Sequence, residues 1–274
     1  MAKSSYPTDL SDQEWKIIKR ILEREEPYTT GRHTEVELRE VWNAILYINK
    51  TGCQWHYLPH DFPPPTTVNY HYLKWMRKGI YQKVNDELRQ QLRKQIGRNE
   101  KPSAGIIDSQ SVKGTVESGR QESGFDGGKL VKGRKRHIIV DTIGCLLIVV
   151  VHAANIADSK GARTALKKLF ETLATLQLIW ADCGYRGGLI KWVEEQFGCI
   201  VEIVKKQARK GFKVLPRRWV VERTLAWLTR YRRLSKEYER NPSSSEAMVY
   251  IASIRLMLKR LNQLSEQAHV EMAA

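Results

Sequence analysis

The chain has 274 residues and a net charge of +16, from 46 Lys and Arg against 30 Asp and Glu. Hydrophobic residues make up 42% of it, which excludes a wholly disordered chain, and the length suffices for one or two domains with a hydrophobic core. A globular protein this basic is expected to have a polyanionic partner, and nucleic acid is the first candidate. A merely basic protein without such a partner is the alternative.

The cysteines and the apolar runs exclude further classes. The four cysteines lie far apart and form no CxxC pair, which argues against a disulfide framework and a zinc ribbon. The longest apolar run, 145–151, is too short to span a bilayer, and residues 1–10 lack the apolar core of a signal peptide. We therefore expect a soluble cytoplasmic protein with no membrane partner.

Two capping-box pairs predict helices near the N-terminus. Ser11 and Glu14 stand in front of an apolar stripe at helical spacing, and Thr34 and Glu37 stand in front of a second one. The second helix should end at Gly52, since glycine is the usual residue after a helix end.

Two more helices complete this first region. A third helix should begin near Thr66 or Thr67, and a fourth, highly charged helix should run to about Ile96. The segment 97–105 resembles a linker. We therefore predict a small all-helical domain over residues 1–98.

The composition then changes to short apolar runs that are typical of buried strands. Strands are predicted at 103–112, at 137–140, at 145–153, at 176–182 and at 199–204, with residues 141–144 as a tight turn between the second and the third. Helices should begin at Ser159, Gly187 and Pro216, and a last helix should span roughly 245–264. Three strands before the first helix indicate a mixed sheet rather than a doubly wound parallel one. The predicted fold class is therefore α/β, with a mixed-sheet domain over residues 99–266.

Three acidic residues stand out in this basic chain. Asp108 lies at the end of the first predicted strand, Asp182 follows the fourth, and Glu222 lies on the helix after the fifth. If the first and fourth strands are neighbours, both aspartates face one crevice, because ligand sites gather beyond the carboxyl ends of strands. Three carboxylates together need a counter-ion, and Mg²⁺ suits carboxylates and phosphate chemistry. Two ions about 3.5–4 Å apart would stabilise the attacking and leaving oxygens of an in-line displacement.

Each acidic residue also has an ordinary structural explanation, and the residues alone leave it open. An aspartate at a strand end commonly caps a turn, and Glu222 can pair with Arg218, four residues before it. Ser109 is expected to be a polar residue at the strand end, and Asp158 the residue that caps the next helix, outside the catalytic set.

Six ordered blocks of sequence resemble the DDE transposases of bacterial insertion sequences, specifically the IS5 family within the IS4-like group. The blocks are GCQW and LP at 52–59, IIDSQSVK at 106–113, GKLVKGRKRHIIVDTIG at 128–144, ANIADS at 154–159, ADCGYRG at 181–187 and RRWVVERTLAWL at 217–228. The resemblance covers nearly the whole chain. It implies an RNase H-like catalytic domain preceded by a helix-turn-helix-like domain.

The resemblance also assigns site residues. Asp108, Asp182 and Glu222 fall on the catalytic, metal-binding DDE triad, with two Mg²⁺ ions as cofactors and Mn²⁺ as a substitute. The Arg of the IS4-like signature is Arg218, whereas Leu215 and Thr229 stand at its Tyr and Lys positions. That departure leaves open which groups hold the phosphate beside the cleaved bond.

Cationic residues gather around the acidic ones and are predicted to bind DNA phosphates, which gives affinity without sequence specificity. The DNA-binding candidates are Lys129, Lys132, Arg134, Lys135, Arg136, Arg218, Arg223 and Arg230. A second basic group lies at 205–213, and the helix start at 67–74 is the candidate for reading the DNA sequence. The alternative for any such run is a solvated charged face.

The resemblance implies a transposase that binds terminal inverted repeats, cleaves a phosphodiester at each end and joins the freed 3′-OH to target DNA. Its partner would be double-stranded DNA, bound by a homodimer in the bacterial cytoplasm in association with the nucleoid. Two rivals remain: an RNase H-like nuclease that cuts without joining, and a non-catalytic or domesticated DNA-binding protein.

Overall fold

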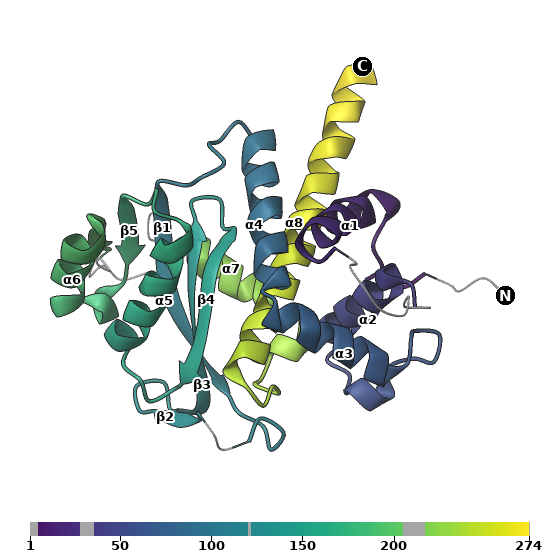
Figure 1. Cartoon of the computed structure of the whole chain (residues 1–274). Helices are drawn as coiled ribbons and strands as arrows, with labels where there is room; N and C mark the ends of the chain where they lie inside the picture. Colours follow the sequence, from purple (N-terminus) through teal and green to yellow (C-terminus); the bar gives the residue numbers. More distant parts are fainter. Residues whose placement is uncertain (1–4, 28–35, 120–121, 205–216, 274) are drawn as a thin grey trace, which may run out of the picture.

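The computed structural model describes residues 5–27, 36–119, 122–204 and 217–273. Figure 1 shows the N-terminal helices on one side of the molecule and a β-sheet on the other. The long helix α8 (Pro242–Ala273) runs between these two parts, and its C-terminal end projects beyond them.

Four helices form the N-terminal part, as predicted: α1 (Asp12–Glu25), α2 (Leu38–Thr51), α3 (Pro65–Arg77) and α4 (Ile80–Gln95). The first capping box is confirmed, because the Ser11 hydroxyl accepts from the Glu14 amide and the Glu14 carboxylate accepts from the Ser11 amide. The second is wrong for Glu37, which directly precedes α2 and forms no side-chain cap, while Thr34 lies outside the described residues. Gly52 ends α2 with a φ of 74°, as expected.

The sheet consists of β1 (Ala104–Lys113), β2 (Gly124–Asp126), β3 (Val131–Asp141), β4 (Leu146–Ala153), β5 (Leu178–Ala181) and β6 (Ile200–Ile203). Central β1 pairs antiparallel with β3 and parallel with β5. Beyond them β4 pairs antiparallel with β3, and β6 pairs parallel with β5. This is the predicted mixed, RNase H-like sheet. The short strand β2, which pairs with the start of β3, is an addition to the prediction.

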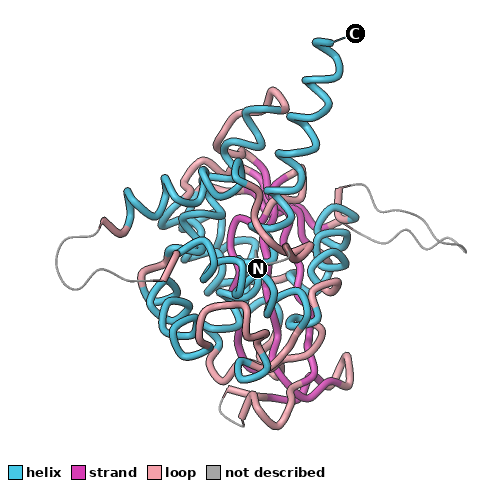
Figure 2. Tube along the Cα trace, turned by 90° about the vertical axis from the view of Figure 1, so that its right-hand side faces the viewer, coloured by secondary structure: helices cyan, strands magenta, loops and turns pink. Residues whose placement is uncertain are grey.

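Helices cover both faces of the sheet (Figures 1 and 2). On one face, α5 (Asp158–Thr172) and α6 (Gly188–Phe197) pack over Ile107. On the other, α7 (Trp219–Leu228), α4 and α8 pack over Ile106, and this core continues into the N-terminal helices. The predicted start of α7, Pro216, lies outside the described residues, and α8 extends beyond the predicted 245–264 at both ends.

Buried polar contacts hold α8 to both neighbours. Arg255 donates to both oxygens of Glu14 on α1, each at 2.8 Å. The Ser253 hydroxyl donates to Asn85 on α4, and the Asn85 amide donates to the Leu146 carbonyl on β4 at 2.9 Å. The N-terminal helices, α8 and the sheet are thus linked by specific hydrogen bonds as well as by apolar packing.

Among the described segments, none of the helices combines the length and the apolar character that a bilayer crossing requires.

Candidate active site

The three acidic residues lie on three elements that meet beside the centre of the sheet. β1 and β5 are parallel neighbours in which Ile106 is opposite Trp180. Asp108 and Asp182 each follow two residues later, so they reach the same level along the sheet. Glu222 lies in the first turn of α7, which packs over this part of β1. The expectation that the first and fourth predicted strands are neighbours is confirmed.

A single guanidinium joins the three carboxylates. Nη2 of Arg218 lies 3.8 Å from an oxygen of Asp108, 3.8 Å from one of Asp182 and 3.3 Å from one of Glu222. The ordinary local roles are present as well, since Glu222 pairs with Arg218 and Asp182 accepts from the Gly184 amide at 2.8 Å. The structure therefore brings together residues that are up to 114 positions apart in the chain, around one cation.

The surroundings of Asp108 change its ionisation. The pKa of Asp108 is raised from 3.8 to about 6, and burial is the largest cause. The Ser109 amide, which donates to Asp108 Oδ1 at 2.7 Å, and the Arg218 charge lower this pKa, while Asp182 raises it further. A carboxylate with a raised pKa in a concave site is a common feature of functional sites.

The donor set suits a divalent cation, although the arrangement is not a preformed cage. Among the described residues, no group of three His, Cys, Asp or Glu side chains stands ready to hold a metal ion. A single guanidinium faces three carboxylates, which leaves an excess of negative charge, and carboxylate oxygens are the ligands that Mg²⁺ prefers. The Asp182 and Glu222 side chains are 35% and 49% exposed, which leaves them room to turn toward an ion. Asp108, Asp182 and Glu222 are the residues that could hold it.

The basic run expected to bind DNA is largely inside the molecule, and this corrects part of the prediction. Arg134, Lys135 and Arg136 belong to β3 and are 1%, 4% and 3% exposed. Residues of a central strand have neighbours on both faces, so their charges are satisfied by protein groups rather than by phosphates. These three cations therefore have structural partners and present no DNA-facing surface.

The partners of Arg134 and Arg136 form a cluster that we call the β3 clamp, made of Arg134, Arg136, Arg233, Glu237 and Glu239. Arg134 donates to the Glu239 carbonyl and Arg136 to the Leu234 carbonyl, each at 2.7 Å, and Arg136 pairs with Glu237. Arg233 pairs with Glu239 at 2.7 Å. The clamp ties the segment before α8 to the sheet.

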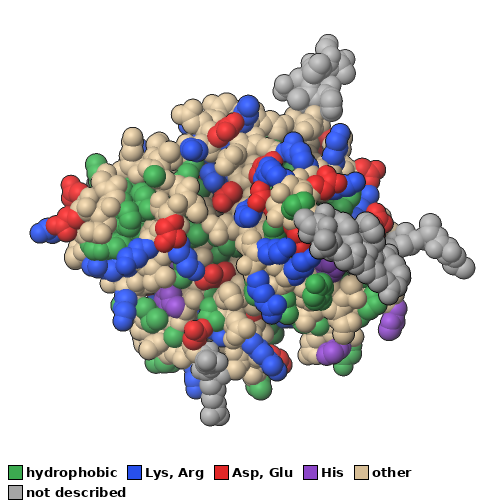
Figure 3. All heavy atoms as spheres, viewed as in Figure 1, with side chains coloured by type: hydrophobic (Ala, Val, Ile, Leu, Met, Phe, Trp, Pro, Cys, Tyr) green, Lys and Arg blue, Asp and Glu red, His purple; other side chains and the backbone are tan. Residues whose placement is uncertain are grey.

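Of the other DNA-binding candidates, Arg218 is also buried, with 6% of its surface exposed. Lys129, Lys132 and Arg230 are exposed, and the ammonium of Lys129 donates to the Ser109 carbonyl at 3.1 Å. Arg223 is half-buried and stacks on the rings of Trp219 and Trp227 at 4.5 Å each. Lys and Arg side chains are spread over the face seen in Figure 3, interspersed with acidic ones. The second basic group at 205–213 and Leu215 lie outside the described residues.

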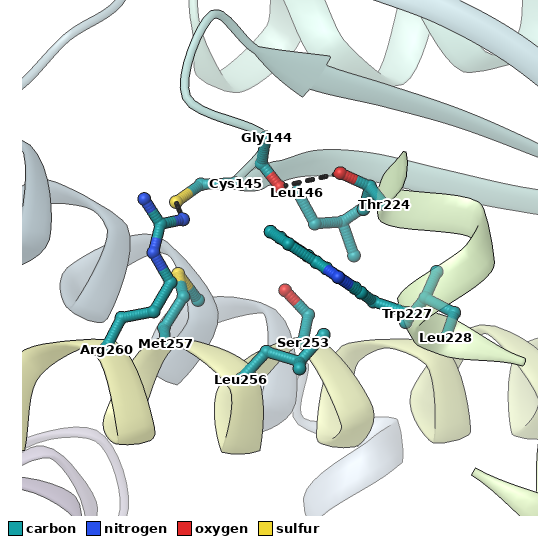
Figure 4. A pocket seen from close by; sticks show the side chains of 10 residues that line it. All are labelled: Gly144, Cys145, Leu146, Thr224, Trp227, Leu228, Ser253, Leu256, Met257 and Arg260. Atoms are coloured by element: carbon teal, nitrogen blue, oxygen red, sulfur yellow. Dashed lines mark hydrogen bonds between the residues drawn. The ribbon is translucent and has the colours of Figure 1, made fainter. Parts of the chain in front are cut away.

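α7 is held against the turn between β3 and β4 by hydrogen bonds. The Thr224 hydroxyl donates to the Gly144 carbonyl at 3.1 Å, and Arg260 of α8 donates to the Ile143 carbonyl at 3.2 Å. Figure 4 shows these side chains around a cavity of about 10 Å³, which is room for roughly one water molecule. The helix that carries Arg218 and Glu222 is therefore seated firmly on the turn between β3 and β4.

The helix predicted to read the DNA sequence is α3. Some of its polar and aromatic side chains have partners inside the protein, and others are accessible to solvent. His71 is buried, and Lys74 pairs with Glu26 of the N-terminal part. Tyr70 is 61% exposed. Asn69 lines a groove of about 750 Å³ together with Trp55 and other residues, among them Arg240.

The prediction that Asp108 ends its strand is wrong, because β1 continues to Lys113 in its pairing with β3. The fold, with one aspartate in the middle of β1, a second directly after the neighbouring strand β5 and a glutamate on the helix packed across them, is that of an RNase H-like DDE domain. A family model described as a transposase DDE domain matches residues 99–257, and one described as a putative transposase of the IS4/5 family matches residues 10–85. The chain therefore belongs to the DDE transposases of the IS4/IS5 type.

One curated relative gives the scale of the similarity. It is a putative transposase for insertion sequence element IS402 from Burkholderia cepacia, 30% identical over 119 residues. The alignment covers 39% of this chain and 54% of that relative, so the chain spans about half the length of the relative it matches.

Proposed function

We propose that the chain is a DNA transposase that binds the terminal inverted repeats of an insertion sequence, cleaves a phosphodiester at each end and joins the freed 3′-OH to target DNA. The observation that supports this most is the convergence of Asp108, Asp182 and Glu222 within 4 Å of one atom of Arg218, in a chain of the DDE family. Phosphoryl transfer depends mainly on positioning and electrostatics, which such a cluster can provide.

In this proposal the three carboxylates hold two Mg²⁺ ions, or Mn²⁺ in their place. When bound, such ions activate water and stabilise the attacking and leaving oxygens of the phosphate. The Ser109 amide keeps the Asp108 carboxylate oriented. Arg218, which holds the three carboxylates in the metal-free protein, would lie beside a bound phosphate, for which a guanidinium is well suited. No protein nucleophile is required.

DNA contacts in this proposal come from the exposed cations. Lys129, Lys132 and Arg230 bind phosphates around the site, and Arg223 holds α7 and its exposed Trp219 toward the DNA. Residues 1–98 read the transposon ends and residues 99–266 carry out the chemistry. Two copies bridge the two ends as a homodimer on DNA, in a bacterial cytoplasm beside the nucleoid.

The experiment combines purified protein, Mg²⁺, a labelled transposon-end duplex and a supercoiled plasmid. The wild type should cleave the duplex and produce joined plasmid. Asp182→Asn and Glu222→Gln should each lower cleavage by at least about 10²-fold. Their affinity for the end duplex, measured in Ca²⁺ or without metal, should change by less than about threefold, since neither residue is assigned a DNA contact.

The rival functions predict different products. Cleavage without any joined plasmid would assign the chain to the nucleases of the same fold. Binding without cleavage by the wild type would indicate a DNA-binding protein. Cleavage retained in either variant would refute the role given to that residue.

A further inference from the structure

Asp158 at the start of α5 does not have the role expected from its position. The cap of α5 is Ala157, and Asp158 is the first residue of the helix proper. Its Oδ1 accepts instead from the Ser109 hydroxyl at 2.9 Å and from the Lys135 ammonium at 3.0 Å. The prediction of a helix cap is therefore wrong, and the carboxylate is directed at the strand that carries Asp108.

Ser109 connects Asp158 to Asp108. The side chain of Ser109 donates to Asp158, while its backbone amide donates to Asp108 Oδ1 at 2.7 Å. Ser109 is only 7% exposed, so both bonds lie in a region where water competes little. The position of the Asp108 carboxylate therefore depends on a residue that Asp158 holds.

The second oxygen of Asp158 faces the loop that carries Asp182. A methyl group placed on Gly184 would lie 3.0 Å from Asp182 Oδ1 and 3.4 Å from Asp158 Oδ2. Both carboxylates therefore lie beside Gly184, where a side chain would crowd them. Asp158 is consequently next to one triad member and linked by hydrogen bonds to another.

The charge around Asp158 is only partly compensated. Lys135 lies 3.0 Å from Asp158 and also 3.4 Å from Asp126, so one ammonium serves two carboxylates. His137 lies 3.9 Å from Asp158 Oδ1, but burial lowers its pKa well below the ordinary range and keeps it neutral. Negative charge therefore remains beside the triad.

We propose that Asp158 is a fourth acidic residue of the catalytic site: a positioning residue that holds the Asp108 carboxylate through Ser109 and adds negative charge beside Asp182. The inference rests on the proposed function, because it assigns Asp158 to the same cation-dependent chemistry. Residues that orient metal ligands typically change metal affinity or activity by about 10–100-fold when they are mutated.

The chain offers a matched control for the test. Asp126 also accepts a hydrogen bond from a serine of β1, Ser111, at 2.5 Å, and it also contacts Lys135. Ser111 lies two residues further along β1 from Asp108 than Ser109 does. Asp158→Asn and Asp126→Asn each remove one negative charge beside the Lys135 ammonium. Each keeps a side-chain oxygen that can accept a hydrogen bond. A loss of fold would affect both variants, whereas an effect on the site should be confined to Asp158→Asn.

The measurements are Mn²⁺ binding to the DNA-free protein by electron paramagnetic resonance, thermal unfolding, and the rate of end cleavage against Mn²⁺ concentration. Asp158→Asn should weaken Mn²⁺ binding by about tenfold and raise the Mn²⁺ concentration for half-maximal cleavage equally. Asp126→Asn should stay within about twofold of the wild type in both. Ser109→Ala, which removes only the linking hydroxyl, should lower the cleavage rate by about tenfold.

The outcomes separate this inference from the proposed function. If Asp158→Asn binds Mn²⁺ and cleaves as Asp126→Asn does, the inference is overturned, while Asp108→Asn, which should neither bind Mn²⁺ tightly nor cleave, still supports the proposed function. If Asp108→Asn cleaves like the wild type, the proposed function itself fails. Weakened Mn²⁺ binding in Asp158→Asn with unchanged thermal unfolding supports the inference.

Discussion

Two clusters of opposite charges lie along β1 and β3, and they differ in how completely the charges are compensated. In the β3 clamp, three guanidiniums face two carboxylates and several backbone carbonyls at distances down to 2.7 Å, and every member is under 10% exposed. Around Arg218, one guanidinium faces three carboxylates at 3.3–3.8 Å, and two of these carboxylates are at least one-third exposed. The first cluster has one more cation than carboxylates, and backbone carbonyls accept the additional hydrogen bonds, whereas the second cluster has an excess of acid.

This difference in charge balance helps to distinguish charged residues that stabilise the fold from charged residues that serve a function. Buried ions persist when partners on every side satisfy them, and removing one partner leaves an uncompensated charge. A group of like charges with a single loose counter-ion is instead suited to exchanging that counter-ion for another cation. Abundance of charge in the sequence does not distinguish these cases, but its balance in space does.

Removing a cation from the β3 clamp should have the largest effect. Arg136→Met leaves Glu237 buried without one of its main counter-charges, so we expect the free energy of unfolding to fall by about 3–5 kcal/mol. Lys132→Met, at an exposed position of the same strand, should change it by less than about 0.5 kcal/mol. Urea unfolding followed by circular dichroism measures both, and equal effects would remove the distinction between the two clusters.

Removing the cation of the acidic cluster should have a smaller effect that a metal can reverse. Arg218→Gln takes the guanidinium from three carboxylates, so the metal-free protein should lose about 1–3 kcal/mol of stability. Millimolar Mg²⁺ should then raise the melting temperature of Arg218→Gln more than that of the wild type, because ion binding relieves a larger repulsion. Arg230→Gln, at an exposed position, is the control, and an equal Mg²⁺ response in all three proteins would contradict the prediction.

The pKa of Asp108 predicts a pH dependence of stability in metal-free buffer. Because this pKa is raised from 3.8 to about 6, the folded state binds the proton more tightly, and wild-type stability should fall as the pH rises from about 4 through 6. Asp108→Asn lacks this loss, so at pH 8 it should be more stable than the wild type by about 3 kcal/mol, the free energy that corresponds to this pKa shift. The difference should shrink toward pH 4.5 in thermal melts, whereas a constant gap would show that Asp108 does not titrate in this range. Glu171→Gln, at an exposed position of α5, serves as the control.

The smallest effects belong to exposed cations outside both clusters. Lys132→Gln and Arg230→Gln should leave stability unchanged and weaken DNA binding mainly at low salt. Each should reduce the slope of log affinity against log salt concentration by about 1, as expected for the loss of one phosphate contact. Fluorescence anisotropy with an end duplex across a salt series measures the slopes, and wild-type slopes in both variants would assign these two residues to a solvated face.

The sequence predicted that the three acidic residues meet, because each follows a readable apolar pattern and all three fall in blocks that resemble the DDE family. Asp108 and Asp182 follow apolar runs typical of strands, and Glu222 follows an apolar helix pattern. The sequence left open whether the two strands are neighbours, and the structure shows that they are. The reach of Arg218 to Asp108 and Asp182 was not predictable from spacing, because it depends on how α7 crosses β1. Spacing alone indicated only its pairing with Glu222.

The basic run of β3 was misjudged for a physical reason. A strand inside a sheet usually shows apolar residues, and Lys-Gly-Arg-Lys-Arg shows none apart from glycine. Its compensating partners, Glu237 and Glu239, lie about 100 residues later, so no local pattern reveals them. Gly133 interrupts the basic run, and the structure shows why a glycine stands there. A Cβ at this position would lie 2.1 Å from the Val112 carbonyl, so only glycine lets β3 continue beside β1.

The position of α8 has a consequence for how the protein is made. Residues 242–264 supply the surface on which α1 and α4 rest, through Arg255 and Ser253. The ribosome synthesises them after all the strands and all the other helices that the structure describes. The apolar faces of α1 and α4 that pack on α8 therefore stay exposed during most of translation. Nascent chains stopped before residue 242 should bind chaperones strongly, and an insertion-sequence copy truncated there would yield no assembled product rather than a weaker one.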